Sequence, residues 1–157
     1  MMEYAKGNEV DHIPYMLCGA DTAANMYGYT LQQYRESLDV RFDIMEKMNK
    51  EFGTAAVGIG VGLKSIGEAV GSTLRYPEDG LDFVTDHILK DYDQLDDMKV
   101  VDPYKCSNLK KIMDDFRKSK ERFPNWGSGN NVAGPMTTAT SIRSLEAILK
   151  DSVRRKE

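Results

Sequence analysis

Polar residues late in the chain surround a glycine-proline turn and could bind a substrate. Asn131 precedes the Gly134-Pro135 pair, and two threonine hydroxyls follow it. Groups at the carboxyl end of a strand face the ligand in β/α proteins. We therefore predict four substrate-binding residues here: Asn131, Gly134, Thr137 and Thr138. The alternative is a helix N-terminus with threonine caps, and this segment alone leaves both interpretations open.

Glycine occupies every second position of an apolar segment, at Gly58, Gly60 and Gly62. Ile59 and Val61 lie between them, and this period of two predicts a buried strand. A strand face without side chains lets a packed layer, another chain or a ligand approach the backbone. The three glycines are therefore our candidate cofactor-binding residues. They lack the third glycine of a dinucleotide fingerprint and lie within the strand, which disfavours phosphate binding.

Candidate metal ligands and catalytic pairs are sparse. The chain has two histidines and two cysteines, with no two of them at a chelating spacing: His12, His87, Cys18 and Cys106. We therefore assign no metal ligand. Adjacent acids such as Asp96-Asp97 point to different faces of their element, so a general acid and base pair is disfavoured. No catalytic residue is assigned.

Helical patterns predict the elements of the first third of the chain. Thr30 and Gln33 form a capping-box pattern, which predicts a short helix over residues 31–36. Apolar residues recur every four positions over residues 38–52, and Gly53 follows at the place of a left-handed cap. A second, longer helix is therefore predicted over residues 38–52.

Strands and helices alternate in the remainder. After the glycine strand we predict a short strand over residues 72–76, an acidic connector over 81–103 with aspartate-capped helical turns, and a strand over 130–134. Helices are predicted over 107–122 and after Ser141 or Ser144. The last helix carries an apolar stripe: Ile142, Leu145, Ile148, Leu149 and Val153. This alternation predicts right-handed β/α units on a parallel sheet.

Composition narrows the class of protein. The chain has 157 residues, of which 41% are hydrophobic and 29% are charged, and this composition is typical of one globular domain. The chain is too short for a complete eight-stranded β/α barrel, which needs about 250 residues. A net charge of -4 disfavours nucleic acid as a partner. No apolar segment reaches the about 20 residues that span a membrane, and no signal peptide is evident. We therefore predict a cytoplasmic protein without a membrane or nucleic-acid partner.

Four segments, in order, resemble the uroporphyrinogen decarboxylase superfamily. They are Asp11-His12-Ile13-Pro14, Phe52-Gly53-Thr54-Ala55-Ala56-Val57, Asp102-Pro103-Tyr104 and Asn131-Val132-Ala133-Gly134-Pro135-Met136-Thr137. Residues 68–71 and 76–80 fit the same family between them. The resemblance implies an α/β fold: part of a (β/α)8 TIM barrel with N-terminal helices, the first two or so β/α units and parallel strands. We predict a single domain over residues 1–157, with a helical extension over 1–53 and the β/α units over 54–157.

The resemblance also bears on the reaction, because the family contains decarboxylases and cobamide-dependent methyltransferases. The decarboxylases share an N-terminal arginine motif that grips carboxylates, whereas no arginine precedes Arg35 here. They also carry an aspartate at the end of the first strand, where this chain has Gly62. Both differences favour the methyltransferase branch, which passes a methyl group from a corrinoid to a thiol or folate acceptor.

The resemblance implies that the full-length methyltransferases of the family use a corrinoid and a zinc ion. Their zinc ligands lie after the turn near Gly134, and this chain does not contain them. We therefore expect no cofactor bound by this chain alone and no activity without further polypeptide, so whether the chain is itself an enzyme stays open. Expected partners are a second copy or a complementing chain, and a corrinoid protein. The alternatives are uroporphyrinogen decarboxylation for heme biosynthesis and a non-catalytic module that associates with itself or a partner.

Overall fold

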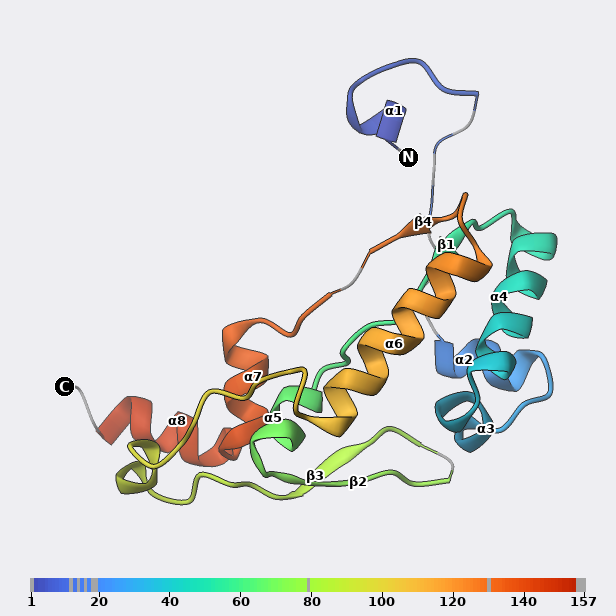
Figure 1. Cartoon of the computed structure of the whole chain (residues 1–157). Helices are drawn as coiled ribbons and strands as arrows, with labels where there is room; N and C mark the ends of the chain where they lie inside the picture. Colours follow the sequence, from blue (N-terminus) through green and yellow to red (C-terminus); the bar gives the residue numbers. More distant parts are fainter. Residues whose placement is uncertain are drawn as a thin grey trace. The chain divides into compact units, whose positions relative to one another are not determined.

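The computed structural model describes residues 2–11, 13, 15, 17, 20–78, 80–129 and 131–154 (Figure 1). Several residues of the sequence motifs lie outside the described residues: His12, Pro14, Cys18, Asp79 and Asn130. The fold mixes helices with short strands. It divides into two compact units, which are described separately: unit 1, Met1–Ile59 with Arg117–Gly129, and unit 2, Gly60–Phe116 with Asn130–Glu157. No helix in the described part of the chain has the length and apolar character needed to cross a bilayer.

Unit 1 begins with four helices: α1 (Met2–Ala5), α2 (Ala20–Met26), α3 (Leu31–Glu36) and α4 (Leu38–Phe52). The predicted helices over 31–36 and 38–52 are confirmed. The Gln33 backbone N–H donates to Thr30 Oγ1 over 3.1 Å, and the Thr30 N–H donates to Gln33 Oε1 over 2.9 Å. This reciprocal pair satisfies two backbone donors that the first turn of α3 would otherwise leave unpaired. The unit packs around a small apolar core: Ala23, Ala24, Leu31 and Ile44.

Gly53 ends α4 in the left-handed conformation that the sequence predicted. Its φ is 71°, and its N–H donates to the Asn49 carbonyl over 2.8 Å. An added Cβ there would lie 3.6 Å from the Tyr15 hydroxyl, an ordinary contact. The requirement for glycine is therefore conformational, because only glycine adopts this region without cost.

We expect Gly53→Ala to lower the free energy of unfolding by about 1 kcal/mol, the usual cost of a left-handed alanine. Urea denaturation followed by circular dichroism measures the change. Gly53→Asn is the control, because asparagine tolerates the left-handed conformation better than alanine does. We expect this variant to lose less free energy of unfolding than Gly53→Ala. Equal stability of the alanine variant and the parent would contradict the conformational argument.

A parallel pair of two-residue strands, β1 (Ala56–Val57) and β4 (Gly127–Ser128), completes unit 1. The strand predicted over residues 130–134 is wrong, since pairing occurs before it and residues 131–134 form no strand. Aromatic packing explains the difference. Phe123 is buried in a cluster with Val57, and Trp126 stacks on it at 4.2 Å. This packing brings the next residue into the ladder, where the Gly127 N–H donates to the Ala55 carbonyl over 2.9 Å.

Unit 2 contains an antiparallel hairpin between β2 (Thr73–Arg75) and β3 (Phe83–Asp86), with α5 (Ser65–Val70) before it and a short 3-10 helix, η1 (Tyr92–Leu95), after it. The predicted strand over 72–76 is confirmed, whereas β3 occupies part of the predicted connector. β3 carries exposed side chains at most positions, so a single-sequence pattern gives it no buried face. Asp91 caps η1, as expected of an aspartate in this connector.

Three helices complete the chain: α6 (Ser107–Arg122), which runs from unit 2 into unit 1, α7 (Pro135–Ile142) and α8 (Leu145–Arg154). The predicted helix over 107–122 is confirmed. Ser144 begins the last helix by accepting from the Ala147 N–H over 3.2 Å, so of the two candidate caps it is Ser144 that is used. α7 corresponds to the alternative left open for the Gly134-Pro135 segment, a helix N-terminus, although Gly134 and not a threonine is its N-cap. Pro135 begins it, because a missing N–H costs nothing in a first turn.

Candidate functional site

Two glycines directly follow the carboxyl ends of the parallel strands in unit 1. Val57 of β1 pairs with Ser128 of β4, so Gly58 and Gly129 are the next residues at the same sheet edge. Both are exposed, and a Cβ added to either would meet nothing within 4 Å. We call Gly58 and Gly129 the glycine edge. Carboxyl ends of parallel strands are where β/α proteins bind ligands.

The elements around the glycine edge hold β1 in place. Asn49, in the last turn of α4, donates from Nδ2 to the carbonyl of buried Thr54 over 2.9 Å. This bond fixes the turn from α4 into β1. One side of the strand packs on a buried apolar cluster: Met45, Val57, Ile59 and Phe123.

The alternation predicted for the glycine segment is confirmed. Val57 and Ile59 are buried, while Gly58 and Gly60 are exposed. The ladder itself is shorter than predicted, because only Ala56 and Val57 pair with β4. Since nothing approaches the Cβ position of Gly58, packing of the described residues does not require glycine there. A bare, accessible backbone suits the approach of a flat ligand, and it offers hydrogen-bonding groups rather than acid or base chemistry.

Gly60 and Gly62 belong to unit 2. Gly60 is exposed, and Gly62 adopts φ 72° in the turn before α5, where an added Cβ would lie 3.5 Å from Ser65 Oγ. Gly62 is therefore a turn residue and not part of a strand face. The cofactor-binding role of the three glycines stays a prediction.

The four predicted substrate-binding residues lie at the start of α7, in unit 2. Asn131 and Gly134 are exposed, and Gly134 is the N-cap, with no side-chain cap. Thr138 donates from Oγ1 to the Ala133 carbonyl over 3.3 Å, so its proton stabilises the turn into the helix. Thr137 is half-buried in the first turn. Their role toward a substrate stays a prediction, and Thr138 is positioned to hold the backbone.

Gly129 was missed by sequence reasoning. The sequence signal for it is the Gly127-Ser128-Gly129 triplet, which follows the only tryptophan. This triplet has glycine at alternate positions, as the first predicted strand does. The strand predicted over residues 130–134 begins after this triplet, so Gly129 was not assigned to a strand end. Only the register of β1 with β4 brings Gly129 beside Gly58.

A group of side chains with shifted pKa values in unit 1 is formed by Asp43 and Lys47 of α4 with Tyr29, which precedes α3. Lys47 bonds the Asp43 carboxylate over 2.6 Å and, with the Tyr29 hydroxyl at 2.7 Å, lowers the pKa of Asp43. The same bond from Tyr29 to Asp43 raises the pKa of the Tyr29 hydroxyl. These side chains are half-buried, and those of Lys47 and Asp43 are 43% and 40% exposed, so the group stabilises the surface of α4 modestly. Within the described residues, no group of three or more His, Cys, Asp or Glu side chains is arranged to hold a metal ion.

Comparison with known proteins places the fold. The family model described as uroporphyrinogen decarboxylase (URO-D) matches residues 1–157. A methyltransferase from Methanosarcina mazei matches with a TM-score of 0.74 and 18% identity, over 98% of this chain and 47% of that chain. This chain therefore spans about half the length of that solved structure. No curated protein matches the chain. The predicted fold class, an α/β part of a barrel with parallel strands, is confirmed.

Proposed function

The chain belongs to the uroporphyrinogen decarboxylase family, and from this membership we propose that it is the N-terminal portion of a methyltransferase-type member. The complete form would move a methyl group from a corrinoid to a thiol or folate acceptor. The glycine edge carries this proposal, because it offers a bare backbone at the carboxyl ends of the parallel strands, where such a group would approach.

The absence of a carboxylate at position 62 argues against decarboxylation. The resemblance aligns this position with the aspartate of the decarboxylases, yet Gly62 adopts φ 72°. Residues other than glycine adopt this conformation at a cost, asparagine and aspartate least. The backbone therefore suits glycine at this position, and it is the absence of the carboxylate itself that disfavours decarboxylation. The lack of an arginine before Arg35 also favours the methyltransferase branch of the family over the decarboxylases.

We propose that a corrinoid would bind at the glycine edge, and the open space at both Cβ positions supports this. When bound, a methylcorrinoid supplies an electrophilic methyl group. Gly58 and Gly129 would leave the macrocycle room beside the sheet, and the Gly58 and Gly129 backbone would offer hydrogen bonds to its polar rim. Buried Val57 and Phe123 hold this edge rigid from behind.

The described residues do not offer a zinc site. Of the histidines and cysteines, His87 and Cys106 are described, and no metal-holding group forms around either. No step of the proposed reaction is therefore assigned to zinc on this chain. Activation of the acceptor would require residues beyond the portion of the fold described here, so we propose that the chain turns over only with a complementing polypeptide.

Binding of methylcobalamin tests the glycine edge without requiring turnover. Trp126 is the only tryptophan and immediately precedes β4, so quenching of its fluorescence reports the titration. We expect saturable binding, and we expect Gly58→Val to weaken it at least about tenfold, because a side chain placed against a flat ligand costs 1–3 kcal/mol. Ala55→Val is the matched control: it adds a similar side chain at the exposed amino end of the same strand, and affinity should not change.

Binding that Gly58→Val leaves intact would refute the glycine edge as the corrinoid site. Turnover of methylcobalamin with a thiol by this chain alone would refute the need for a complementing polypeptide. Formation of coproporphyrinogen from uroporphyrinogen would assign the chain to the decarboxylases instead.

A further inference from the structure

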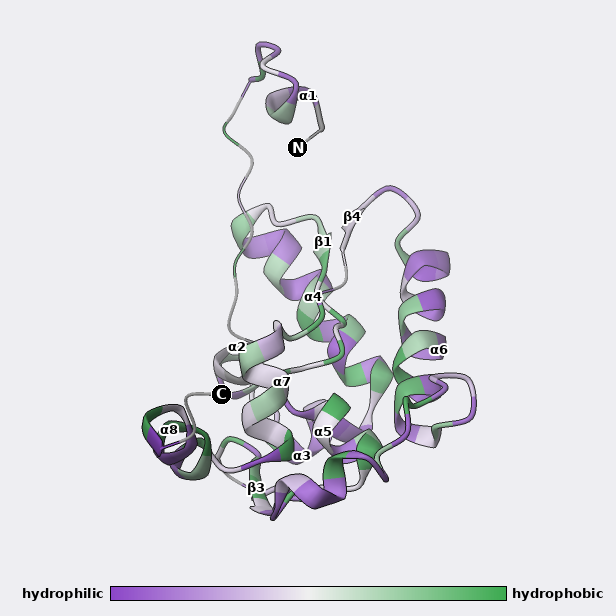
Figure 2. Cartoon of the chain, turned by 90° about the vertical axis from the view of Figure 1, so that its left-hand side faces the viewer, coloured by the Kyte–Doolittle hydropathy of each residue, from purple (hydrophilic) through white to green (hydrophobic). Residues whose placement is uncertain are grey.

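Asn49 is a polar residue on an apolar face of α4. Phe42, Met45 and Asn49 follow one another at intervals of three and four residues, which places their side chains on one side of the helix. Met45 belongs to the buried cluster that supports β1, and Phe42 packs against that cluster. Figure 2 shows hydrophobic and hydrophilic residues together along α4. An apolar side chain would suit the packing at position 49, so the half-buried asparagine there requires a polar role.

Both the backbone and the side chain of Asn49 bond to the turn between α4 and β1. The Asn49 carbonyl accepts from the Gly53 N–H over 2.8 Å, which closes the left-handed cap of the helix. Its Nδ2 donates to the carbonyl of buried Thr54 over 2.9 Å. A buried carbonyl that loses its donor is unfavourable. The Asn49 amide therefore fixes the path of the chain as it leaves the helix.

The Thr54 carbonyl lies one residue before the ladder that joins β1 to β4. The carbonyl of the next residue, Ala55, accepts from the Gly127 N–H over 2.9 Å, and Ala56 pairs with Gly127. Each of the two strands has only two residues. A pair of strands this short is marginally stable by itself, so the bond from Asn49 is one of the few contacts that hold its backbone in place.

We propose that Asn49 is a positioning residue for the glycine edge. By holding the Thr54 carbonyl, it holds the ladder after which Gly58 and Gly129 follow, and so presents the backbone of both glycines in one arrangement. A ligand that meets a preorganised site does not have to select one arrangement from many, and it binds more tightly for that reason. The inference rests on the proposed function for the identity of this ligand, a corrinoid.

Two substitutions of similar size remove the Asn49 donor in different ways. Asn49→Leu supplies the apolar side chain that this face of α4 accommodates, and Asn49→Asp replaces the donor by an acceptor at neutral pH. Hydrogen exchange of the Gly127 amide, followed by NMR, measures the ladder without any ligand. We expect exchange to become at least about tenfold faster in both variants, because a buried carbonyl next to the ladder loses its donor.

Methylcobalamin binding, followed by quenching of Trp126 fluorescence, gives the readout at the site itself. We expect the dissociation constant to rise at least about fivefold in both variants, because a loosened site is competent to bind for only a fraction of the time. Ile44→Val is the control, since Ile44 lies on the same helix but packs in the cluster with Ala23, Ala24 and Leu31. It lowers stability without touching the turn, and we expect Gly127 exchange and affinity to stay within about twofold of the parent.

Three results would overturn the positioning role of Asn49. The first is unchanged Gly127 exchange in both Asn49 variants. The second is faster exchange with the affinity of the parent, and the third is an equal loss of affinity in Ile44→Val, which stability alone would explain. Circular dichroism verifies that each variant keeps its helices. If the parent chain does not bind methylcobalamin, the proposed function fails, and faster Gly127 exchange in both variants would still support Asn49 as the residue that positions the glycine edge.

Discussion

Replacing Gly67 by alanine is expected to lower the free energy of unfolding by about 3 kcal/mol, the upper part of the range for overpacking. Gly67 is the buried residue of α5, and α5 packs against α7 within unit 2. A Cβ added at Gly67 would lie 2.6 Å from both the Cβ and the carbonyl oxygen of Ser141. Atoms of this kind do not approach so closely, so the two helices would have to separate.

The sign of this effect is diagnostic. Alanine in place of a helical glycine stabilises an isolated helix by about 1 kcal/mol, so helix propensity predicts a gain where the packing predicts a loss. Thermal and urea denaturation of the variant measure the net change. Gly58→Ala is the control, because its added Cβ meets nothing within 4 Å, and its effect should stay within about 0.5 kcal/mol. A Gly67→Ala variant as stable as the parent would show that the two helices are not held at this distance.

A second substitution separates the clash from the serine side chain. Ser141→Gly removes the hydroxyl and Cβ of Ser141 but leaves its carbonyl oxygen, which is also 2.6 Å from the added Cβ. We therefore expect the double variant Gly67→Ala/Ser141→Gly to recover only part of the loss. Full recovery would assign the clash to the side chain alone.

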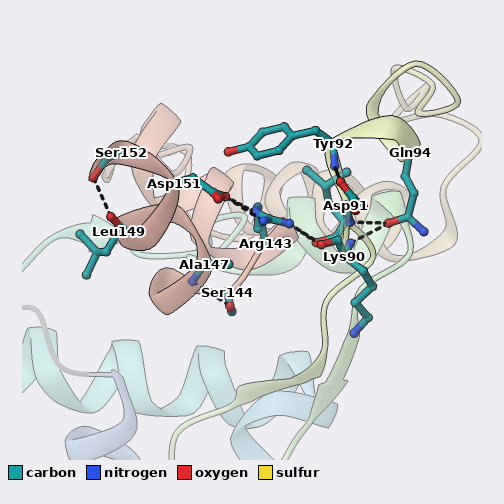
Figure 3. Close-up of polar contacts among 11 residues, drawn as sticks. Lys90, Asp91, Tyr92, Gln94, Arg143, Ser144, Ala147, Leu149, Asp151 and Ser152 are labelled. Carbon is teal, nitrogen blue, oxygen red and sulfur yellow. Dashed lines mark hydrogen bonds and ion pairs between the residues drawn. The ribbon is translucent and has the colours of Figure 1, made fainter. Parts of the chain in front are cut away.

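Asp151→Ala is expected to destabilise unit 2 by about 2 kcal/mol, below the 3–5 kcal/mol of a fully buried pair because this one is partly exposed. The Arg143 and Asp151 side chains are 12% and 18% exposed. Arg143 also donates to the Lys90 carbonyl over 2.6 Å, and its guanidinium lies 4.7 Å from the centre of the Tyr92 ring (Figure 3). Removing the carboxylate would leave a mostly buried cation with one partner fewer.

Arg143→Lys tests whether geometry or charge matters. An ammonium retains the charge but cannot bond Asp151 and the Lys90 carbonyl together in one plane, so we expect most of the loss to remain. Lys105→Ala is the control, because the Lys105 ion pair with Asp102 is exposed and 3.6 Å long, and such pairs contribute little. Chemical denaturation measures all three variants. If Arg143→Lys were as stable as the parent, the positive charge of Arg143 alone, and not the geometry of its guanidinium, would account for its contribution.

The helices that the sequence predicted well are those with local signals. The bounds of α3 follow from the Thr30 capping box, and those of α4 from its four-residue period and Gly53. These interactions join residues a few positions apart, so one sequence contains all the information. α2 and α5 escaped prediction because they are short and carry weaker periodic patterns.

The strands show the opposite behaviour. Both partners of a strand pair are needed to place either one, and β1 and β4 are about 70 residues apart. The sequence predicted the alternating burial around Ile59, but the strand that it predicted over residues 130–134 lies several residues after β4, the actual partner of β1. β3 was missed because its side chains are mostly exposed and it pairs through its backbone with β2.

By itself the sequence determined the family, through four ordered motifs, and the helices whose caps are local. It also predicted a bare glycine face after β1. Only the tertiary structure decided that Gly129 and Gly58 follow two paired strands, that Gly67 must be glycine, and that Arg143 links Lys90 and Tyr92 to Asp151 of α8. Each of these depends on residues distant in the chain, and a distance in space between such residues is fixed by packing, which no local pattern encodes.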